Sequence, residues 1–398
     1  MAGQPSGIIL SPRQGHPICL KAEATVGLLV FVPMNTAYRR KFSFLFTLLF
    51  RILPSAAFRI PGAIVRALLK KLPLGSSVWN GFVGALMDNT TPDELQTILP
   101  STTDTYNAWV SSNGATHAVD VLAADNSTRL LWIGPRKAKN VVLFFHGGGY
   151  VMPLSIGHLD WMAHVKKEAL DAGIQLSVCI LEYDLIPAKP YPRQMSQGIF
   201  AFEYLVDLGY KPSEIVFGGD SAGGHLSLSL MAHLHHPRST NQGTENLIDL
   251  HGTVRGCFLV SPLASFDFKT AAYQRRLNAD ILSRKVVHKW GDYLVENSPW
   301  LEEISAGNGW GMALDVPESW WQNFRSVDRI LLTGGYEEVF SDHIQQLGNM
   351  LERQSQGAVT LHMGNETHDR PLMDFISGRR PSETTNTITR FVISCFRG

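Results

Sequence analysis

The chain has 398 residues, of which 44% are hydrophobic, and this is enough for one large α/β domain with an appended lid. Its 35 basic and 35 acidic residues cancel and no basic block occurs, so the sequence lacks the electrostatic signature of nucleic-acid binding. The four cysteines are widely spaced without a C-x-x-C pair, so we expect no metal site.

The N-terminal part of the chain has two features that bear on its location. Residues 1–20 lack the charged start, apolar stretch and cleavage site of a secretory signal, so we expect a cytoplasmic protein. Residues 41–69 are strongly apolar, but Pro54 and Pro61 interrupt them before the ~20 apolar residues that a spanning helix requires. We therefore expect an amphipathic helical region that covers an active site or lies on a membrane surface, and we favour the lid.

Further along the chain, short apolar runs alternate with helical patterns. Thr91 is expected to open a short helix that has Pro92 at its first position. The predicted strands are 117–122, 128–133, 140–145, 176–181, 215–217, 254–260, 329–333 and 359–363. The predicted helices among and after them are 161–172, 191–208, 225–233, 342–354 and 383–396. Because strands alternate with helices, we predict a mostly parallel, doubly wound sheet.

Residues 265–322 interrupt this alternation. They are rich in tryptophan and predict helices without strands, so we interpret them as an insertion that forms part of a lid. The resulting division has an N-terminal helical lid region over 1–105 and a catalytic domain over 106–264 and 323–398, with the insertion between its two parts.

The G-x-S-x-G motif at residues 219–223 has a strand pattern before it and leucines four residues apart after it. Strand, tight turn and helix are the context of a nucleophile elbow, in which Ser221 would be the nucleophile. Glycines flank such a serine because side chains there would collide with the neighbouring strand and helix. The motif alone is a common chance match, so its interpretation depends on the rest of the chain.

A glycine triplet follows the apolar strand 140–145, where the chain reads H-G-G-G at residues 146–149. Without Cβ atoms, these residues allow backbone N–H groups to point at an anion. We expect the N–H groups of Gly148, Gly149 and Ala222 to form an oxyanion hole, with Gly147 as a further candidate donor.

A serine nucleophile also needs a base. His368 follows the last predicted strand, and the order serine, acid, histidine is that of an α/β-hydrolase. His362 is the nearest rival, but it lies within the strand rather than on the loop beyond it. We therefore predict that His368 is the base.

The acid is expected on the loop after strand 329–333. No aspartate occupies the expected place there, so a glutamate is needed to orient the imidazole. We prefer Glu338, then Glu337 and then Asp342.

Together, these motifs resemble the hormone-sensitive-lipase branch of the α/β-hydrolases over about residues 106–398. The matching stretches are H-G-G-G-Y at 146–150, Y-D-L-I-P at 183–187, P-Y-P at 190–192 and G-D-S-A-G-G at 219–224. The resemblance implies the α/β-hydrolase fold with a helical lid, and it places Glu338 where the family has an aspartate. The overall pattern is similar to fungal steryl-acetyl-hydrolase-like and secondary-metabolism members.

We therefore expect a serine esterase, of deacetylase type, that cleaves a small hydrophobic ester such as a secondary metabolite with Ser221, His368 and Glu338, without metal or cofactor. Two alternatives stay open. One is acyl transfer, lactonisation or condensation in a biosynthetic pathway on the same scaffold. The other is a non-catalytic ligand-binding receptor, against which the presence of both Ser221 and His368 argues. The sequence identifies neither the acyl and alcohol groups nor the oligomeric state.

Overall fold

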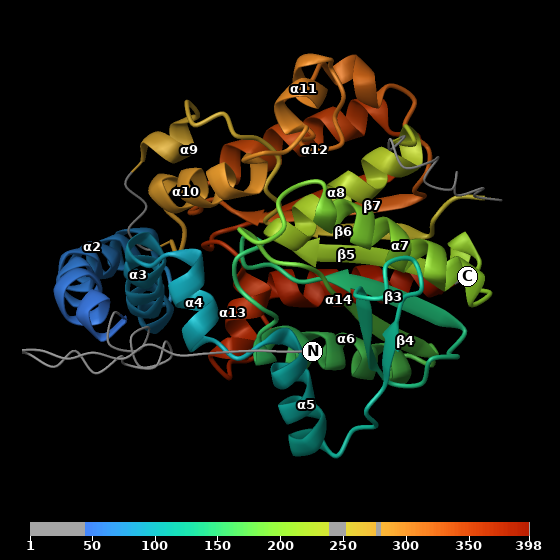
Figure 1. Ribbon diagram of the computed structural model, residues 1–398, viewed down its shortest axis with the longest axis horizontal. Coiled ribbons are helices and arrows are strands. Elements are labelled where there is room, and N and C mark those ends of the chain that lie inside the picture. The colour runs from blue at the N-terminus through green and yellow to red at the C-terminus, as the bar shows by residue number, and fades with distance from the viewer. Residues whose placement is uncertain (1–43, 239–251, 276–279, 398) are drawn as a thin grey trace, which may run out of the picture.

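The computed structural model describes residues 44–238, 252–275 and 280–397, so the first 43 residues of the predicted lid region lie outside the described part (Figure 1). An eight-stranded sheet in the order β1-β2-β4-β3-β5-β6-β7-β8 forms its centre. The strands are β1 Val119–Val121, β2 Arg129–Ile133, β3 Asn140–Phe145, β4 Leu176–Glu182, β5 Ile215–Asp220, β6 Gly256–Val260, β7 Arg329–Gly335 and β8 Ala358–Gly364.

The sheet is mostly parallel, as the sequence predicts. Strand β2 runs antiparallel to both β1 and β4, while the pairs along β4-β3-β5-β6-β7-β8 are all parallel. Strand β3 reads N-V-V-L-F-F and is buried along its whole length, which is typical of a parallel strand with helices on both faces. In such a sheet the loops at the carboxyl ends of the strands lie side by side, and these are the loops that carry the candidate site.

Helices cover both faces of the sheet (Figure 1). Helices α7, α8 and α12 pack on one face, and α6 and α14 pack on the other. The α-helices are α2 Leu53–Lys70, α3 Leu74–Asn89, α4 Pro92–Ile98, α5 Thr102–Asn113, α6 Ile156–Asp171, α7 Arg193–Asp207, α8 Ala222–His235, α9 Ala271–Gln274, α10 Arg284–Val295, α11 Trp300–Ser305, α12 Ser341–Gln354, α13 Arg370–Ile376 and α14 Glu383–Phe396. Shorter segments are η1 Leu48–Ile52, which is π-helical, and the 3₁₀ turns η2 Pro212–Glu214 and η3 Glu318–Trp321.

The apolar N-terminal segment is helical, as expected, and forms one continuous helix that neither proline breaks. Pro54 lies in the first turn of α2 and Pro61 lies inside it. The π-helical η1 ends two residues before Pro54, and such local π adjustments help a helix to accommodate a residue that has no N–H group. Among the described residues, Phe44–Lys70 is the one helix long and apolar enough to cross a membrane, judged by length and composition alone.

Two further helical regions bear on the predicted division of the chain. Helix α5 crosses the boundary expected at residue 105, and its Trp109 indole donates a hydrogen bond of 2.7 Å to Asp160 of α6, so this helix belongs with the sheet layers. The insertion between β6 and β7 contains α9, α10, α11 and η3 and, in its described residues, no strand, in agreement with the sequence.

Candidate active site

Strand β5 ends in a sharp turn that holds Ser221 at the start of α8. Ser221 has φ +52° and ψ −112°, a strained backbone conformation for a residue other than glycine, and its N–H donates to the Val260 carbonyl at 2.8 Å. The Phe145 carbonyl at the end of β3 approaches the turn closely. A Cβ atom would lie 2.2 Å from this oxygen at Gly219 and 1.9 Å from it at Gly223, so only glycine fits either position.

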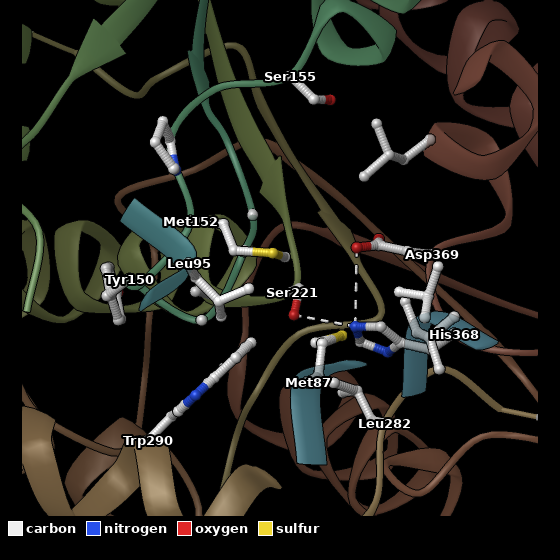
Figure 2. A pocket seen from close by; sticks show the side chains of 18 of the residues that line it. Met87, Leu95, Tyr150, Met152, Ser155, Ser221, Leu282, Trp290, His368 and Asp369 are labelled. Carbon is white, nitrogen blue, oxygen red and sulfur yellow. Dashed lines mark hydrogen bonds and ion pairs between the residues drawn. The ribbon is translucent and has the colours of Figure 1, made fainter. Parts of the chain in front are cut away.

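The loops after β7 and β8 bring Glu338 and His368 to Ser221, and Figure 2 shows the serine and the histidine. His368 Nε2 lies 2.9 Å from Ser221 Oγ, and His368 Nδ1 lies 3.3 Å from Glu338 Oε2. The Ser261 hydroxyl donates a further hydrogen bond of 2.8 Å to the same Glu338 oxygen. The predicted nucleophile, base and preferred acid therefore lie together in one buried group.

The surroundings of His368 act on its pKa in opposite directions. Burial disfavours the imidazolium and lowers the pKa, whereas the nearby Glu338 and Asp280 carboxylates favour the imidazolium. The carboxylates outweigh the burial, so the pKa of His368 lies above its ordinary value of 6.5.

The rival acids have other partners. Glu337 accepts a hydrogen bond of 2.7 Å from Arg66 Nε and lies 3.2 Å from Lys70 Nζ, both on helix α2. Asp342 accepts a hydrogen bond of 2.7 Å from the Ala272 N–H in the insertion. The structure therefore brings neither Glu337 nor Asp342 to the histidine.

The rival base also lies elsewhere. His362 is on β8, and its Nε2 lies 3.2 Å from the Thr384 hydroxyl at the start of α14. It is therefore separated from the serine by its position within the strand, as the sequence suggests.

The glycine loop after β3 presents backbone N–H groups to the same pocket. Gly148 and Gly149 have φ values of +102° and +62°, which only glycine adopts without strain. Within the described part of the chain, the N–H groups of Gly148, Gly149 and Ala222 have no acceptor. Gly147 differs, because its N–H donates to Asp220 Oδ1 at 3.0 Å, so the expectation of a further donor at Gly147 is not met.

The tyrosine of the Y-D-L-I-P stretch supports this glycine loop. The Tyr183 hydroxyl donates to the His146 carbonyl at 2.7 Å, and its ring stacks on the His146 imidazole with 4.3 Å between the ring centroids. The stretch therefore acts by positioning the glycine loop.

A second polar network beside the serine was not predicted. Asp220 Oδ2 lies 3.1 Å from His158 Nε2, and Asp369 Oδ2 lies 3.7 Å from His368 Nε2 (Figure 2). Burial and the neighbouring Asp220 carboxylate raise the pKa of Asp369 well above its usual range, which favours a neutral carboxyl group beside the imidazole. The sequence signal for the two aspartates was their position, one next to Ser221 and one next to His368.

The serine opens into a mostly apolar pocket of about 490 Å³. Helices α3, α4, α5, α10 and α13 line it together with the glycine loop after β3, so the N-terminal region and the insertion both cover the site. Side chains from these helices include Trp79, Met87, Leu95, Val286, Trp290 and Met373.

The N-terminal helices also hold the two loops that carry the acid and the base. Besides the contacts of Glu337 with α2, the Asn365 side-chain amide donates to the Lys70 carbonyl at 2.9 Å. The Asn80 side-chain amide of α3 donates to the Thr367 hydroxyl at 3.0 Å, one residue before His368. Helices α2 and α3 are therefore packed into the site rather than appended to the molecule.

A metal site is not evident in the described ranges, where no group of three or more His, Cys, Asp or Glu side chains is arranged to hold an ion.

Comparisons with known proteins agree with this architecture. The mouse (Mus musculus) neutral cholesterol ester hydrolase 1 is 30% identical over 217 residues, which cover 52% of this chain and 49% of that protein. Human hormone-sensitive lipase is 30% identical over 118 residues, covering 27% of this chain and 10% of that protein. The chain thus spans about half or less of the length of these curated relatives.

Solved structures and a family model extend the comparison. A thermostable esterase from Pseudomonas putida superposes with a TM-score of 0.58 at 17% identity, covering 79% of this chain and 93% of that one, which supports the fold alone. A sequence-family model described as the alpha/beta hydrolase fold matches residues 142–370, more than half of the chain. With the sheet order, the elbow and this match, the chain belongs to the α/β-hydrolase fold family.

Proposed function

We propose that the protein is a serine hydrolase that cleaves carboxylic esters. The observation that carries the proposal is the line of Ser221 Oγ, the His368 imidazole and Glu338, joined by distances of 2.9 and 3.3 Å. Family membership supports it, as do the similar proteins, which include a neutral cholesterol ester hydrolase and a carboxylesterase/phospholipase from Mycobacterium tuberculosis.

In the first half of the proposed reaction, His368 takes the proton of Ser221 as Oγ attacks the ester carbonyl. The carbonyl oxygen becomes an oxyanion, which the N–H groups of Gly148, Gly149 and Ala222 would stabilise. The intermediate then collapses: the bond to the alcohol oxygen breaks, and this oxygen receives the proton from His368. An acyl-serine remains.

In the second half, a water molecule gives its proton to His368 and attacks the acyl-serine. Collapse of this second intermediate releases the carboxylic acid, and the proton returns to Ser221. Glu338 has the same role in both halves: it favours the tautomer with the proton on Nδ1 and stabilises the imidazolium.

We propose that the substrate is an ester with a bulky apolar acyl or alcohol part. The mostly apolar walls of the 490 Å³ pocket support this class, because apolar pockets bind ligands mainly by removing apolar surface from water. The motif resemblance to fungal steryl-acetyl and secondary-metabolism hydrolases supports a narrower candidate, the acetyl ester of a sterol-like or other secondary-metabolite alcohol.

A series of nitrophenyl esters of increasing acyl length, assayed with wild type and Ser221→Ala, tests the proposal. Wild type is expected to hydrolyse at least part of the series, and Ser221→Ala is expected to be slower by several orders of magnitude with an unchanged fold. Fluorophosphonate labelling of the serine separates the alternatives. Labelling without hydrolysis of any ester would favour acyl transfer or condensation, and an unlabelled serine would favour a binding protein.

We also propose that helix Phe44–Lys70 lies on a membrane surface, on the cytoplasmic side. Its outward side chains are apolar: Phe50 is 64% exposed and Phe58 is 91% exposed. Two of its basic side chains turn inward, where Arg59 pairs with Asp88 and Arg66 pairs with Glu337, while Arg51 and Lys70 are exposed. Outward apolar and inward charged side chains favour contact with lipid over contact with water.

Contact along one side of the helix is more consistent with these pairs than a spanning arrangement. Helix α2 packs along α3, and through Glu337 it is attached to the loop that carries the proposed acid. A spanning helix would leave these ion pairs in the hydrocarbon region, where charges are costly.

Vesicle co-sedimentation tests the surface proposal. A Phe50→Ser/Phe58→Ser double variant is expected to lose most binding to phosphatidylcholine–phosphatidylserine vesicles while it hydrolyses a short soluble ester at the wild-type rate. The control is Leu170→Ser on helix α6, away from helix Phe44–Lys70, which removes another exposed apolar side chain. Wild type that stays in the supernatant, or equal losses in the double variant and the control, would contradict the proposal.

A further inference from the structure

Asp280 of the insertion lies beneath both loops that carry the proposed acid and base, although no sequence motif contains it. Its side chain is fully buried. One carboxylate oxygen accepts the backbone N–H of His368 at 3.1 Å, and the other accepts the backbone N–H of Val339 at 3.0 Å. Val339 directly follows Glu338, so a single carboxylate joins the two loops.

This arrangement limits the relative movement of the two loops. The oxygens of a carboxylate are held at a constant separation, so two N–H groups bound to one carboxylate are held at a matching separation. The separation of the two loops helps to set the distance between His368 Nδ1 and Glu338 Oε2, which is 3.3 Å. A change in the bridge is therefore a change in the geometry of the acid and the base.

We propose that Asp280 is a positioning residue for ester hydrolysis: its carboxylate holds the loops of Glu338 and His368 at the separation that lets the acid orient the base. The inference rests on the proposed function, because it assigns Asp280 to the geometry of the same site. Asp280 acts through these two residues and, in this role, does not touch the substrate.

The chemistry of the bridge requires a carboxylate rather than an amide. Both partners are N–H donors, so both side-chain atoms have to be acceptors. An asparagine offers one acceptor oxygen, and its NH₂ group would face the second N–H donor. The substitution Asp280→Asn therefore removes one side of the bridge and the negative charge while it keeps nearly the same volume.

The electrostatic surroundings of Asp280 explain why its substitution is expected to change the pH dependence of hydrolysis. Burial and the Glu338 carboxylate raise the pKa of Asp280, whereas His368 and the two backbone N–H groups lower it, with a net pKa of about 7. Tyr273 also faces Asp280, and Asp220 adds to the negative charge around the histidine. Removal of the Asp280 charge is therefore expected to lower the pKa of His368.

The test compares kcat, KM and pH profiles of wild type and Asp280→Asn on a soluble nitrophenyl ester. We expect kcat to fall about 10- to 100-fold, because small misplacements of reacting groups have effects of this size, while KM stays within a few-fold. The acidic limb of kcat/KM is expected to move to lower pH, since the base must be neutral and its pKa is lowered.

A matched control is Asp374→Asn on α13. Asp374 is also fully buried and also accepts a backbone N–H, that of Ser382 at 2.8 Å. Unlike Asp280, it accepts no N–H of the acid loop or the base loop. This variant is expected to unfold at lower temperature and to keep the wild-type kcat and acidic limb.

Three results would overturn the inference: wild-type kcat in folded Asp280→Asn, an acidic limb that does not move, or equal effects in the Asp374→Asn control. If Asp280→Asn does not fold, Asp280→Glu takes its place, because it keeps the charge and displaces the bridge. It is then expected to lower kcat with the limb unmoved, and wild-type kcat would contradict the role. Wild type that neither hydrolyses esters nor reacts with fluorophosphonate would instead defeat the proposed function itself.

Discussion

Two adjacent glutamates on the loop after β7 have different partners. Glu338 faces the imidazole of His368, whereas Glu337 faces Arg66 and Lys70 on helix α2. Both side chains are buried, so burial alone does not distinguish them. The difference comes from the direction of each side chain, which only the folded loop defines.

Substitution of the two glutamates is expected to separate catalysis from stability. Glu338→Gln should lower kcat by about 10³- to 10⁴-fold, since the imidazole loses the carboxylate that orients it and stabilises its protonated form. Glu337→Gln should keep kcat within a few-fold and lower the free energy of unfolding by about 1–2 kcal/mol, because its partner Arg66 is only partly buried. Kinetics and urea unfolding check both variants, and a larger loss of kcat in Glu337→Gln would reverse the assignment of the acid.

The pH dependence of hydrolysis follows from the raised pKa of His368. The base acts in its neutral form, so kcat/KM is expected to fall as the pH decreases through a value above 6.5. In Glu338→Gln the acidic limb should move to lower pH, because a carboxylate that favours the imidazolium is lost. A wild-type limb below pH 6.5 would contradict the electrostatic account of the site.

At the scale of elements, helix α10 of the insertion forms one wall of the pocket. Its Trp290 lies against the glycine loop, where a Cβ atom on Gly149 would be 2.1 Å from the indole (Figure 2). The insertion therefore limits the space next to the proposed oxyanion hole, and its sequence bears on substrate size.

A smaller side chain at this position is expected to change substrate preference. Trp290→Ala should shift the best nitrophenyl ester to a longer acyl chain, because the removed indole leaves space beside the glycine loop. The same change should lower the free energy of unfolding by about 3–5 kcal/mol, a typical effect for a buried tryptophan. The chain-length profile measures the first effect and urea unfolding the second. An unchanged profile in folded Trp290→Ala would show that α10 does not limit the acyl part.

At the scale of the whole molecule, the N-terminal helices, the loops of the sheet and the insertion are distant in sequence but meet at one pocket. The N-terminal helices contact the acid and base loops through Arg66, Lys70 and Asn80, and the insertion contacts the same loops through Asp280. No single region therefore contains the complete site.

These contacts predict cooperative loss of structure and of the site on heating. The extent of fluorophosphonate labelling and the far-UV circular dichroism signal are expected to decline with the same midpoint temperature. The reason is that detachment of the N-terminal helices would expose the buried side chains of Glu337 and Asn80. Loss of labelling well below the main transition would instead identify the N-terminal helices as a separately melting unit.

The eight strands, the elbow and the glycine loop could be predicted from the sequence because they depend on neighbouring residues. A run such as N-V-V-L-F-F indicates a buried strand wherever it occurs, and G-x-S-x-G indicates a turn too tight for side chains. The glycine contacts with Phe145 give that sequence rule its physical basis.

Tertiary contacts decided the rest. Contacts between residues tens to hundreds of positions apart decide three features of the site. Glu338 rather than Glu337 faces the histidine, and Gly147 donates to Asp220 instead of to the oxyanion hole. Asp280 bridges the acid and base loops. The continuous helix through Pro61 likewise differs from its local sequence signal. The sequence thus determined the candidate nucleophile and its fold, while packing determined the partners of each side chain, because direction and distance between remote residues exist only after the chain has folded.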